Sequence, residues 1–375
     1  MNVGISLLTL FPGRVGGSET YVRGLLGAFA TGCGPELATL LTTRHSGPSV
    51  AEFAGERIKI APVASYRPGD SRLTRLLAMQ AARINSARIA RDVPPDLDVI
   101  HYPVTVPIPK LDGLPRVVSL LDVQHHDLQA MFSPAERAFR RWGYDNSARE
   151  ADQVITITQF SADRISELLG IEPERIHAIH LGINHDLFKP DGPTPSTHGL
   201  PSRYLYYPAN AWPHKNHSRL IEAFSRIDDP ELELVLTGGG KGPLTVTDNA
   251  ARVHHLGYVD EQEVAALYRG AEAMIFPSLY EGFGLPPLEA MACGCPVAAS
   301  KTGAVAEVCG DAALLFDPND VDAIEAAISR ISSDSRLRSE LAEAGIKRAA
   351  NFTWERTARR HLEVYRNALA AQGQG

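Results

Sequence analysis

The chain has 375 residues and a formal net charge of −7, and 44% of its residues are hydrophobic and 22% charged. This length favours two globular domains over one, and the acidic balance argues against a general nucleic-acid binder. Four irregularly spaced cysteines exclude a disulfide framework and no apolar run approaches the ~18–20 residues of a membrane span, so we expect a cytoplasmic protein.

The first predicted element is a strand at Val3–Leu8, which leads into a turn at Phe11–Thr20. Because glycine has no Cβ, Gly16 and Gly17 would let the backbone approach a ligand closely. Ser18 would cap the helix that follows. The turn lacks the Gly-x-Gly-x-x-Gly spacing of nicotinamide-cofactor sites, and an ordinary turn is the alternative interpretation.

The segment from Arg72 to Arg91 holds five arginines and no acidic residue. Its apolar residues recur at helical spacing, which predicts a helix with a basic amphipathic face. Such a face can rest on an anionic membrane, as a peripheral contact at the inner side. A solvated helix on the first domain is the interpretation that we favour.

Other strand-like runs of the first half alternate with helical runs, which indicates the α/β class with parallel sheets. These strands are Leu97–Tyr102, Val117–Leu121, Val154–Thr158 and His177–Leu181. Asp96 and Asp98 resemble an Asp-x-Asp metal site, but they lie where a strand begins, so we interpret them as structural. Nothing in the sequence therefore requires a divalent cation.

A break rich in proline and glycine at residues 189–201 predicts an interdomain linker. We expect a domain over residues 1–190, a second domain over residues 191–353, and a final helix over residues 354–375 that can cross back to the first domain. The strands predicted after the linker are Tyr204–Ala209, Leu232–Thr237, Val253–Leu256, Ala273–Phe276, Val297–Ala299 and Ala313–Phe316. The predicted helices are Ser218–Ile227, Glu263–Arg269, Val321–Ile331, Ser339–Ala349 and Trp354–Ala371.

The loop Tyr206–Asn216 leaves the first strand after the linker and precedes a helix. Lys215 would lie near the N-terminus of that helix, where a compact ammonium can neutralise a phosphate. A solvated surface lysine is the alternative. Trp212 would stiffen the loop by packing, and Gly238–Pro243, after the next strand, is best interpreted as a flexible turn.

The segment Leu279–Ala290 is the most informative part of the chain. It joins a buried strand to a helix whose first turn holds Pro286 and Pro287, where a missing N–H costs nothing. Unpaired N–H groups converge where such a helix begins, and this suits a phosphate. Glu281 and Glu289 would bind hydroxyl groups on either side of it, as in a nucleotide sugar, although many α/β proteins carry a similar unit.

Together these segments resemble the retaining GT-B glycosyltransferases of the "glycosyl transferases group 1" family, over almost the whole chain and most strongly from Tyr204 to Pro318. The matching motifs are Phe283–Glu289, Gly294–Val297 and Glu307–Ala313, with Ser161 and Gly182–Asn184 before the linker. The resemblance implies an α/β fold of two doubly wound Rossmann-like domains that face each other across a cleft.

The resemblance also implies a role for each matching residue. Glu281 would contact hydroxyls of the transferred sugar, Glu289 would hold the ribose, and Lys215 would bind the diphosphate. Gly16 and Gly17 would close on the diphosphate. The backbone amides of Phe283, Gly284 and Leu285 would face phosphate or sugar. The backbone of Tyr258 and Val259 would read the nucleobase.

The sequence departs from the family at the donor site. Asn210 stands where the family usually has an arginine. An amide supplies neither the charge nor the bidentate fork of a guanidinium, so another group must share the charge of the diphosphate. Arg14 is a candidate for that role.

A second departure lies in the first half, where Leu121 replaces a common histidine. His125 then becomes the candidate near the reacting sugar, with Asp122 orienting it. A core histidine bonded to a backbone carbonyl is the alternative for either His125 or His126.

The resemblance implies transfer of a hexose from a nucleoside diphosphate sugar to an acceptor hydroxyl, without metal and with retention of the anomeric configuration. The acceptor would be a glycan, a glycolipid or a small molecule, and no cofactor or nucleic acid would take part. Mannosyl- and deoxyhexosyltransferases are the most similar members, so GDP-mannose is the favoured donor, with uridine or thymidine donors as alternatives. The alternatives are a sugar-nucleotide epimerase of the same architecture and a nucleotide-binding homologue that has lost catalysis.

Overall fold

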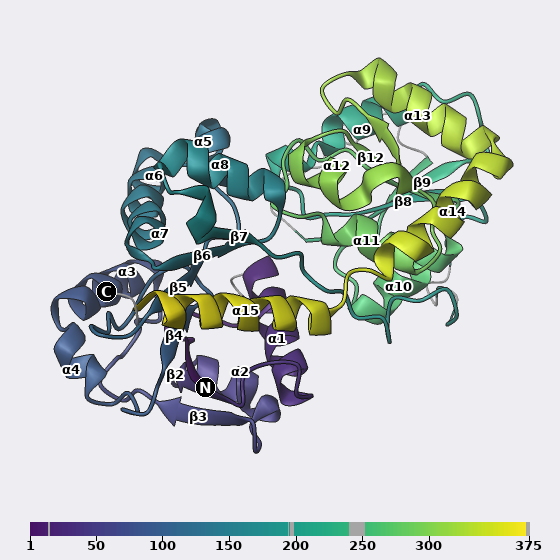
Figure 1. The fold of residues 1–375 in the computed structure, drawn as a ribbon. Helices are drawn as coiled ribbons and strands as arrows, with labels where there is room; N and C mark the ends of the chain where they lie inside the picture. Colours follow the sequence, from purple (N-terminus) through teal and green to yellow (C-terminus); the bar gives the residue numbers. More distant parts are fainter. Residues whose placement is uncertain (14–15, 194, 196–198, 240–251, 373–375) are drawn as a thin grey trace. The chain divides into compact units, whose positions relative to one another are not determined.

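The computed structural model describes residues 1–13, 16–193, 195, 199–239 and 252–372. The chain divides into two units, each built around a parallel sheet (Figure 1). The first comprises Met1–Gly182 and Trp354–Gly375, and the second comprises Ile183–Thr353. The boundary falls after residue 182 and not after residue 190, since the intervening segment packs in the second unit, where Phe188 meets the ring of Tyr268.

The first unit holds a seven-stranded parallel sheet in the order β3-β2-β1-β4-β5-β6-β7. Gly4 in the central strand pairs with Thr39 on one side and with Ile100 on the other. The strands are β1 (Asn2–Ser6), β2 (Leu37–Thr42), β3 (Ile58–Pro62), β4 (Val99–Tyr102), β5 (Arg116–Ser119), β6 (Gln153–Thr156) and β7 (Ile176–Ala178). Strand order reverses at β1, so the sheet is doubly wound. The sequence predicted five of these strands and missed β2 and β3.

Along the chain, helices lie between the strands of this unit, and one more helix follows the second unit (Figure 1). They are α1 (Gly17–Ala30), α2 (Ser46–Val50), α3 (Arg72–Ile84), α4 (Ser86–Ala90), α5 (Gln124–Asp127), α6 (Pro134–Arg140), α7 (Asn146–Glu150), α8 (Gln159–Leu169) and α15 (Trp354–Gln372). A π-helical turn, Arg141–Asp145, lies between α6 and α7. Shorter 3₁₀ turns lie at Ala51–Phe53, Gln129–Met131 and Pro173–Arg175.

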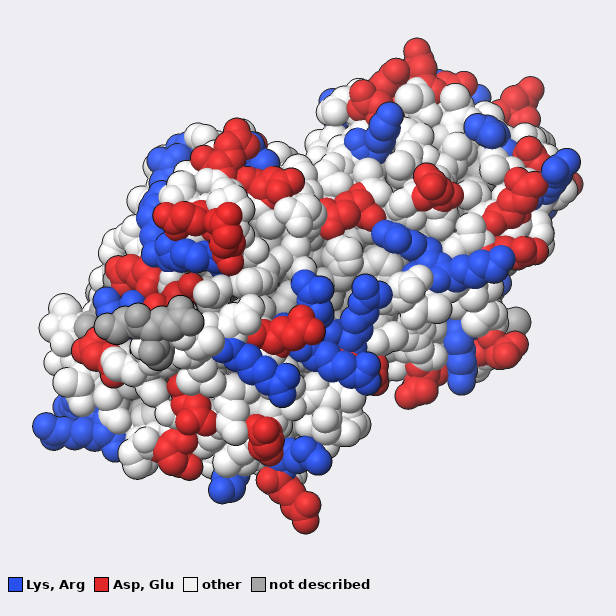
Figure 2. All heavy atoms as spheres, viewed as in Figure 1, with Lys and Arg blue, Asp and Glu red and all other residues white. Residues whose placement is uncertain are grey.

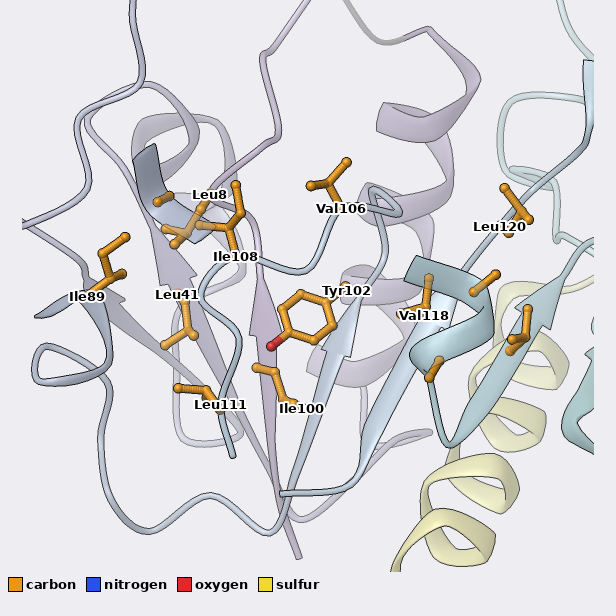
Figure 3. Packing of buried hydrophobic residues seen from close by; sticks show 14 of the residues in the cluster. Leu8, Leu41, Ile89, Ile100, Tyr102, Val106, Ile108, Leu111, Val118 and Leu120 are labelled. Atoms are coloured by element: carbon orange, nitrogen blue, oxygen red, sulfur yellow. The ribbon is translucent and has the colours of Figure 1, made fainter. Parts of the chain in front are cut away.

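One core cluster of the first unit consists of apolar side chains of strands, of loops and of helices (Figure 3). Leu41, Ile100 and Val118 project from β2, β4 and β5 into one cluster. Burying each such side chain contributes about 1.5–3 kcal/mol. Tyr102 joins the cluster and donates its hydroxyl to the carbonyl of Pro109, so its one polar atom is satisfied.

The C-terminal helix α15 belongs to the first unit. The ring of Trp354 lies so close to α1 that a Cβ added to Gly24 would come within 2.1 Å of it. Only glycine therefore fits at this crossing of α1 and α15. Val364, Tyr365 and Ala368 are buried farther along α15, so the helix is part of this unit's core.

Three local expectations can be compared with the first unit. Asp96 and Asp98 both accept hydrogen bonds from Asn2, as expected of structural residues at the start of a strand. Ser18 does not cap α1, because the helix begins at Gly17 with Gly16 as its N-cap and no side chain bonds there. In α3, Leu77 and Ile84 are exposed, and membrane contact of this helix stays a prediction.

The second unit holds a six-stranded parallel sheet in the order β10-β9-β8-β11-β12-β13. Its strands are β8 (Tyr204–Pro208), β9 (Glu233–Thr237), β10 (Val253–His255), β11 (Ala273–Phe276), β12 (Val297–Ser300) and β13 (Leu314–Phe316). Its helices are α9 (His217–Ser225), α10 (Glu261–Gly270), α11 (Leu285–Ala292), α12 (Gly303–Cys309), α13 (Val321–Ser333) and α14 (Ser335–Ala349), with 3₁₀ turns at Pro213–Lys215 and Gly310–Ala312. All six strands were predicted. The strand order reverses between β8 and β11, and ligands of such sheets bind outside the carboxyl ends of the strands at this point.

The surface carries both signs of charge. Figure 2 shows Lys and Arg mixed with Asp and Glu over the visible face of each unit. All four cysteines are free thiols, as their spacing indicated. None of the described helices has the length and apolar character that a membrane crossing requires.

Candidate functional site

The turn between β11 and α11 forms the centre of the candidate site in the second unit. β11 is buried along its whole length, so its carboxyl end is fixed. Gly284 is the N-cap of α11 and has φ 112°, a conformation that favours glycine. Pro286 and Pro287 lie in the first helical turn, as predicted, and no side chain caps the helix. Such an uncapped N-terminus favours an anion.

The loop that follows β8 is tied to this turn by hydrogen bonds. The amide of Leu279 donates to the carbonyl of His214 at 2.8 Å. The side-chain amide of Asn216 donates to the carbonyl of Pro277 at 3.1 Å. Since both bonds are buried or backbone-made, they hold Lys215, which lies between His214 and Asn216, in a defined place beside the turn.

Lys215 and Glu281 form an ion pair. The Lys215 Nζ donates to Glu281 Oε1 at 2.7 Å, and each side chain is 14% exposed. The ammonium also lies 5.7 Å from the ring centroid of Phe276. Lys215 is therefore not a solvated surface lysine, and the structure brings together two of the predicted site residues. A pair with this much water excluded is stronger than a fully exposed one.

Glu289 lies on α11 among other neighbours. The pKa of Glu289 is raised to about 8, chiefly by burial and also by the nearby carboxylate of Glu261, while the Tyr268 hydroxyl opposes both effects. This carboxyl group is consequently protonated for part of the time near neutral pH. The ionised form of such a carboxyl group is stabilised by any ligand whose hydroxyls donate hydrogen bonds to it.

Two hydrogen bonds, one of them to Asn210, join three loops at the same edge of the sheet. Its Oδ1 accepts from the amide of Gly239 at 2.8 Å, and the amide of Gly238 donates to the carbonyl of Gly257 at 2.8 Å. These bonds position Tyr258 and the following Val259, and the Tyr258 ring is exposed. Residues 240–243 of the predicted turn lie outside the described residues.

Trp212 does not pack into its loop as expected. Its side chain is 54% exposed. Its ring contact is with His214, at 5.6 Å between centroids in a tilted arrangement. The loop is held by backbone and Asn216 hydrogen bonds instead.

In the first unit, Gly16 and Gly17 leave open space at the start of α1. Gly16 has φ 50°, and a Cβ added at either position would meet no atom of the described residues within 4 Å. The backbone is therefore accessible, as predicted. Arg14, the proposed substitute for the family's arginine, lies outside the described residues.

His125 is held by a carboxylate that the sequence did not indicate. Its Nε2 lies 2.9 Å from Asp145 Oδ1, and the Nε2 of His126 lies 2.8 Å from Asp145 Oδ2. Asp122 was expected to orient His125, but its Oδ1 accepts from the amide of Gln124 at 3.0 Å. A short side chain at this position bonds readily to the backbone two residues on, so Asp122 shapes the start of α5.

Two family models cover most of the chain. "Glycosyl transferases group 1" matches residues 195–348, and "Glycosyl transferase 4-like domain" matches residues 16–182. The MMP alpha-(1->4)-mannosyltransferase of Mycolicibacterium hassiacum is 31% identical over 321 residues, which cover 78% of this chain and 75% of that protein. The chain belongs to the group 1 glycosyl transferases.

Other known proteins are similar to it in sequence or in fold. The O-antigen chain mannosyltransferase B of Escherichia coli is 30% identical, over 68% of this chain and 72% of that protein. The structure of sucrose-phosphate synthase from Thermosynechococcus elongatus has a TM-score of 0.78 at 23% identity, over 99% of this chain and 100% of that one. WaaG, a glycosyltransferase involved in lipopolysaccharide biosynthesis, has a TM-score of 0.66 at 16% identity, with both chains fully covered. These likenesses confirm the predicted GT-B fold of two Rossmann-like domains.

Proposed function

We propose that this group 1 glycosyl transferase moves a hexose from a nucleoside diphosphate sugar to an acceptor hydroxyl, without metal and with retention of the anomeric configuration. The ion pair between Lys215 and Glu281, beside the uncapped start of α11, is the observation that carries the proposal. It places a cation, a carboxylate and a helix N-terminus at the point where the strand order reverses.

In this mechanism the ion pair is exchanged when the donor binds. The diphosphate attracts the ammonium of Lys215, and the released carboxylate of Glu281 accepts hydrogen bonds from hydroxyls of the hexose. Glu289, which lies on α11, accepts a hydrogen bond from a hydroxyl of the ribose. The N-terminus of α11 adds its partial positive charge to that of Lys215.

The chemistry requires stabilisation of the departing diphosphate. The bond between the anomeric carbon and the phosphate oxygen breaks, the bond to the acceptor oxygen forms on the same face, and a phosphate oxygen takes the acceptor's proton. Lys215 stabilises the charge that develops. Because Asn210 has no charge and bonds to Gly239, we assign the charge stabilisation to Lys215 and to the helix N-terminus.

GDP-mannose is the donor that we propose. Two similar proteins are named as mannosyltransferases, those of Mycolicibacterium hassiacum and Escherichia coli. The acceptor is proposed to be a carbohydrate, a glycolipid or a small molecule that carries a hydroxyl.

Thermal unfolding in the presence of GDP, UDP and dTDP tests the site, because a ligand that binds the folded state raises the apparent stability. We expect GDP to raise the Tm of the wild type and not that of Lys215→Ala. Lys347→Ala, an exposed lysine on α14, is the matched control. If none of the three nucleotides stabilises the wild type, the proposal fails, and proton NMR that shows GDP-mannose turning into another sugar nucleotide would favour an epimerase.

A further inference from the structure

Helix α3 of the first unit has two apolar faces, and only one of them packs on the rest of the protein. Ala82 is 3% exposed and lies in the core cluster, and Met79 packs against that cluster. Leu77 is 60% exposed and Ile84 is 85% exposed, with the exposed Ala81 between them. Residues four and seven apart lie on the same side of a helix. The second face is therefore an apolar stripe that points away from the core.

The charged side chains of the same segment have one sign. From Arg72 to Arg91 the sequence has five arginines and no acidic residue. Arg88 and Arg91 are exposed, and neither forms an ion pair within the part of the chain that the structure describes. The acid that follows, Asp92, accepts a hydrogen bond from the amide of Ser65 at 2.7 Å. The segment that carries the apolar stripe is therefore basic, and its charge is accessible to a partner.

A cavity of about 780 Å³ lies beside α4, the helix that directly follows α3 (Figure 1). Ala87 and Ala90 of α4 and Leu111 contribute apolar walls, and Lys110 and Asp112 contribute the charged groups of the lining. Apolar surface in this region is therefore not limited to the two large side chains on α3.

A second copy of this chain is the obvious alternative occupant of this face. In a two-fold dimer the same patch meets itself, so the arginines of one copy would face those of the other, and like charges oppose association. α3 has 13 residues and is about 20 Å long, whereas a stable interface buries about 1,200–2,000 Å². A bilayer has neither difficulty, since its phosphates attract arginine and its headgroup region takes up single apolar side chains.

We propose that α3 and α4 form a membrane-binding face, in which Leu77 and Ile84 enter the headgroup region of an anionic bilayer and arginines bind the lipid phosphates. α3 then lies in the plane of the surface, because its apolar stripe runs along its length. A helix adapted to water alone would carry polar residues on this side, so the exposed stripe favours the membrane over the solvated helix that the sequence favoured. The inference is independent of the proposed function, because no sugar takes part.

Co-sedimentation with lipid vesicles tests the inference. Vesicles of phosphatidylcholine with about 30% phosphatidylglycerol should bind the wild type at about 0.05 M NaCl and release it at about 0.5 M, and vesicles of phosphatidylcholine alone should not bind it. Leu77→Ser combined with Ile84→Ser should lower the partition coefficient at least about tenfold. Arg88→Glu combined with Arg91→Glu should lower it at least about 25-fold, since each arginine near an anionic surface is worth about fivefold.

Exposed residues on α14 of the second unit supply the matched controls. Ile346→Ser, and Arg336→Glu combined with Lys347→Glu, should bind the vesicles as the wild type does. Because all the substituted side chains are exposed, every variant should also keep the Tm of the wild type.

The substitution Ile84→Trp gives a second readout that does not depend on losing the apolar stripe. Anionic vesicles should shift its fluorescence to shorter wavelength, beyond any change in the wild type, because the added indole leaves water. Absence of wild-type binding to the anionic vesicles, undiminished binding of both double variants, or no fluorescence shift would overturn the inference. So would a dimer, seen by analytical ultracentrifugation, that Leu77→Ser with Ile84→Ser dissociates, since the face would then bind a second copy.

Discussion

The two units treat their polar groups in different ways. In the second unit, Lys215 and Glu281 lie partly open at the edge of the sheet, on loops that directly follow β8 and β11. The first unit instead buries two sets of hydrogen-bonded polar side chains. Besides the cluster around Asp145, five fully buried side chains form one hydrogen-bonded chain: Tyr21, His101, Ser119, His361 and Tyr365. The second unit keeps an ion pair partly exposed, whereas the first unit buries polar side chains that hydrogen-bond to one another.

The direction of every bond in that chain is determined. Nδ1 of His361 can only donate to the carbonyl of Thr357, so its Nε2 must accept from the hydroxyl of Tyr21. Tyr21 then accepts from Ser119.

The same logic continues across the sheet. Ser119, having donated its hydrogen, accepts from Nε2 of His101. Nδ1 of His101 is then an acceptor for the hydroxyl of Tyr365 on α15. Both histidines must be neutral for this chain to exist, and burial indeed lowers the pKa of each, that of His361 to about 4.

The largest effect that we predict concerns the partly exposed ion pair of the second unit. Lys215→Ala should lower kcat for GDP-mannose consumption by about 10²–10³-fold, the range for removing one group that stabilises transition-state charge. Its thermal stability should also fall, because the Glu281 side chain is only 14% exposed and loses the partner of its charge. Steady-state kinetics of Lys215→Ala and of the control Lys347→Ala measure this effect. Equal kcat values for the two variants would show that the ion pair has no part in catalysis.

The difference between the units also explains how much the sequence could predict. The strands of the second unit and its candidate site follow one another in short motifs, so the turn at Gly284, Pro286 and Pro287 was recognisable from local chemistry. Asp145 was not, because it bonds to His125 from 20 residues away and lies in no motif. Tyr21 and His361 are 340 residues apart, and only the folded chain brings them together.

The two missed strands have local causes. β3, at Ile58–Pro62, lies at the edge of the sheet and ends in proline, which edge strands tolerate but which weakens a strand prediction. The alternation of Ile58 and Ile60 around Lys59 could have revealed it. β2, at Leu37–Thr42, is a short apolar run, and such runs do not distinguish strand from helix by periodicity.

Among the buried polar groups, His361→Gln should destabilise the first unit by about 2 kcal/mol at pH 7, since it leaves the hydroxyl of Tyr21 without its partner. The pH dependence is more specific. The pKa of His361 is about 4 when folded, against an ordinary value of 6.5, so the unfolded chain binds the proton first and the wild type loses stability as pH falls from 6.5 towards 4.

Urea unfolding followed by tryptophan fluorescence measures this loss, since two of the three tryptophans, Trp142 and Trp354, lie in the first unit. The slope of stability against pH should be smaller in His361→Gln than in the wild type. His45→Gln, which alters a partly exposed histidine of the same unit, should keep the wild-type slope. An equal slope in all three proteins would mean that the buried chain does not control the acid response.

Glu289 gives the opposite pH dependence. Its pKa is about 8 when folded, against an ordinary value of 4.5, so the folded chain holds a proton that the unfolded chain has lost. Stability should therefore fall as pH rises from 4.5 through 8. Glu289→Gln should remove this slope and be more stable than the wild type at pH 9 by about 2 kcal/mol, given that each pKa unit is worth about 1.4 kcal/mol and that water contact reduces the effect. Urea unfolding at pH 6 and pH 9 checks this, and a variant less stable than the wild type at pH 9 would contradict it.

The smallest effect is expected at Trp212, an aromatic residue in the same loop as Lys215, because its side chain contributes little to the packing of the fold. Its side chain is 54% exposed, and substitutions at such places usually change stability by no more than about 0.5 kcal/mol. Trp212→Ala should therefore unfold in urea within that margin of the wild type. A decrease of more than about 1 kcal/mol in the free energy of unfolding would mean that the indole stabilises the loop of Lys215. The candidate site of the second unit would then depend on side-chain packing, as the buried polar groups of the first unit do.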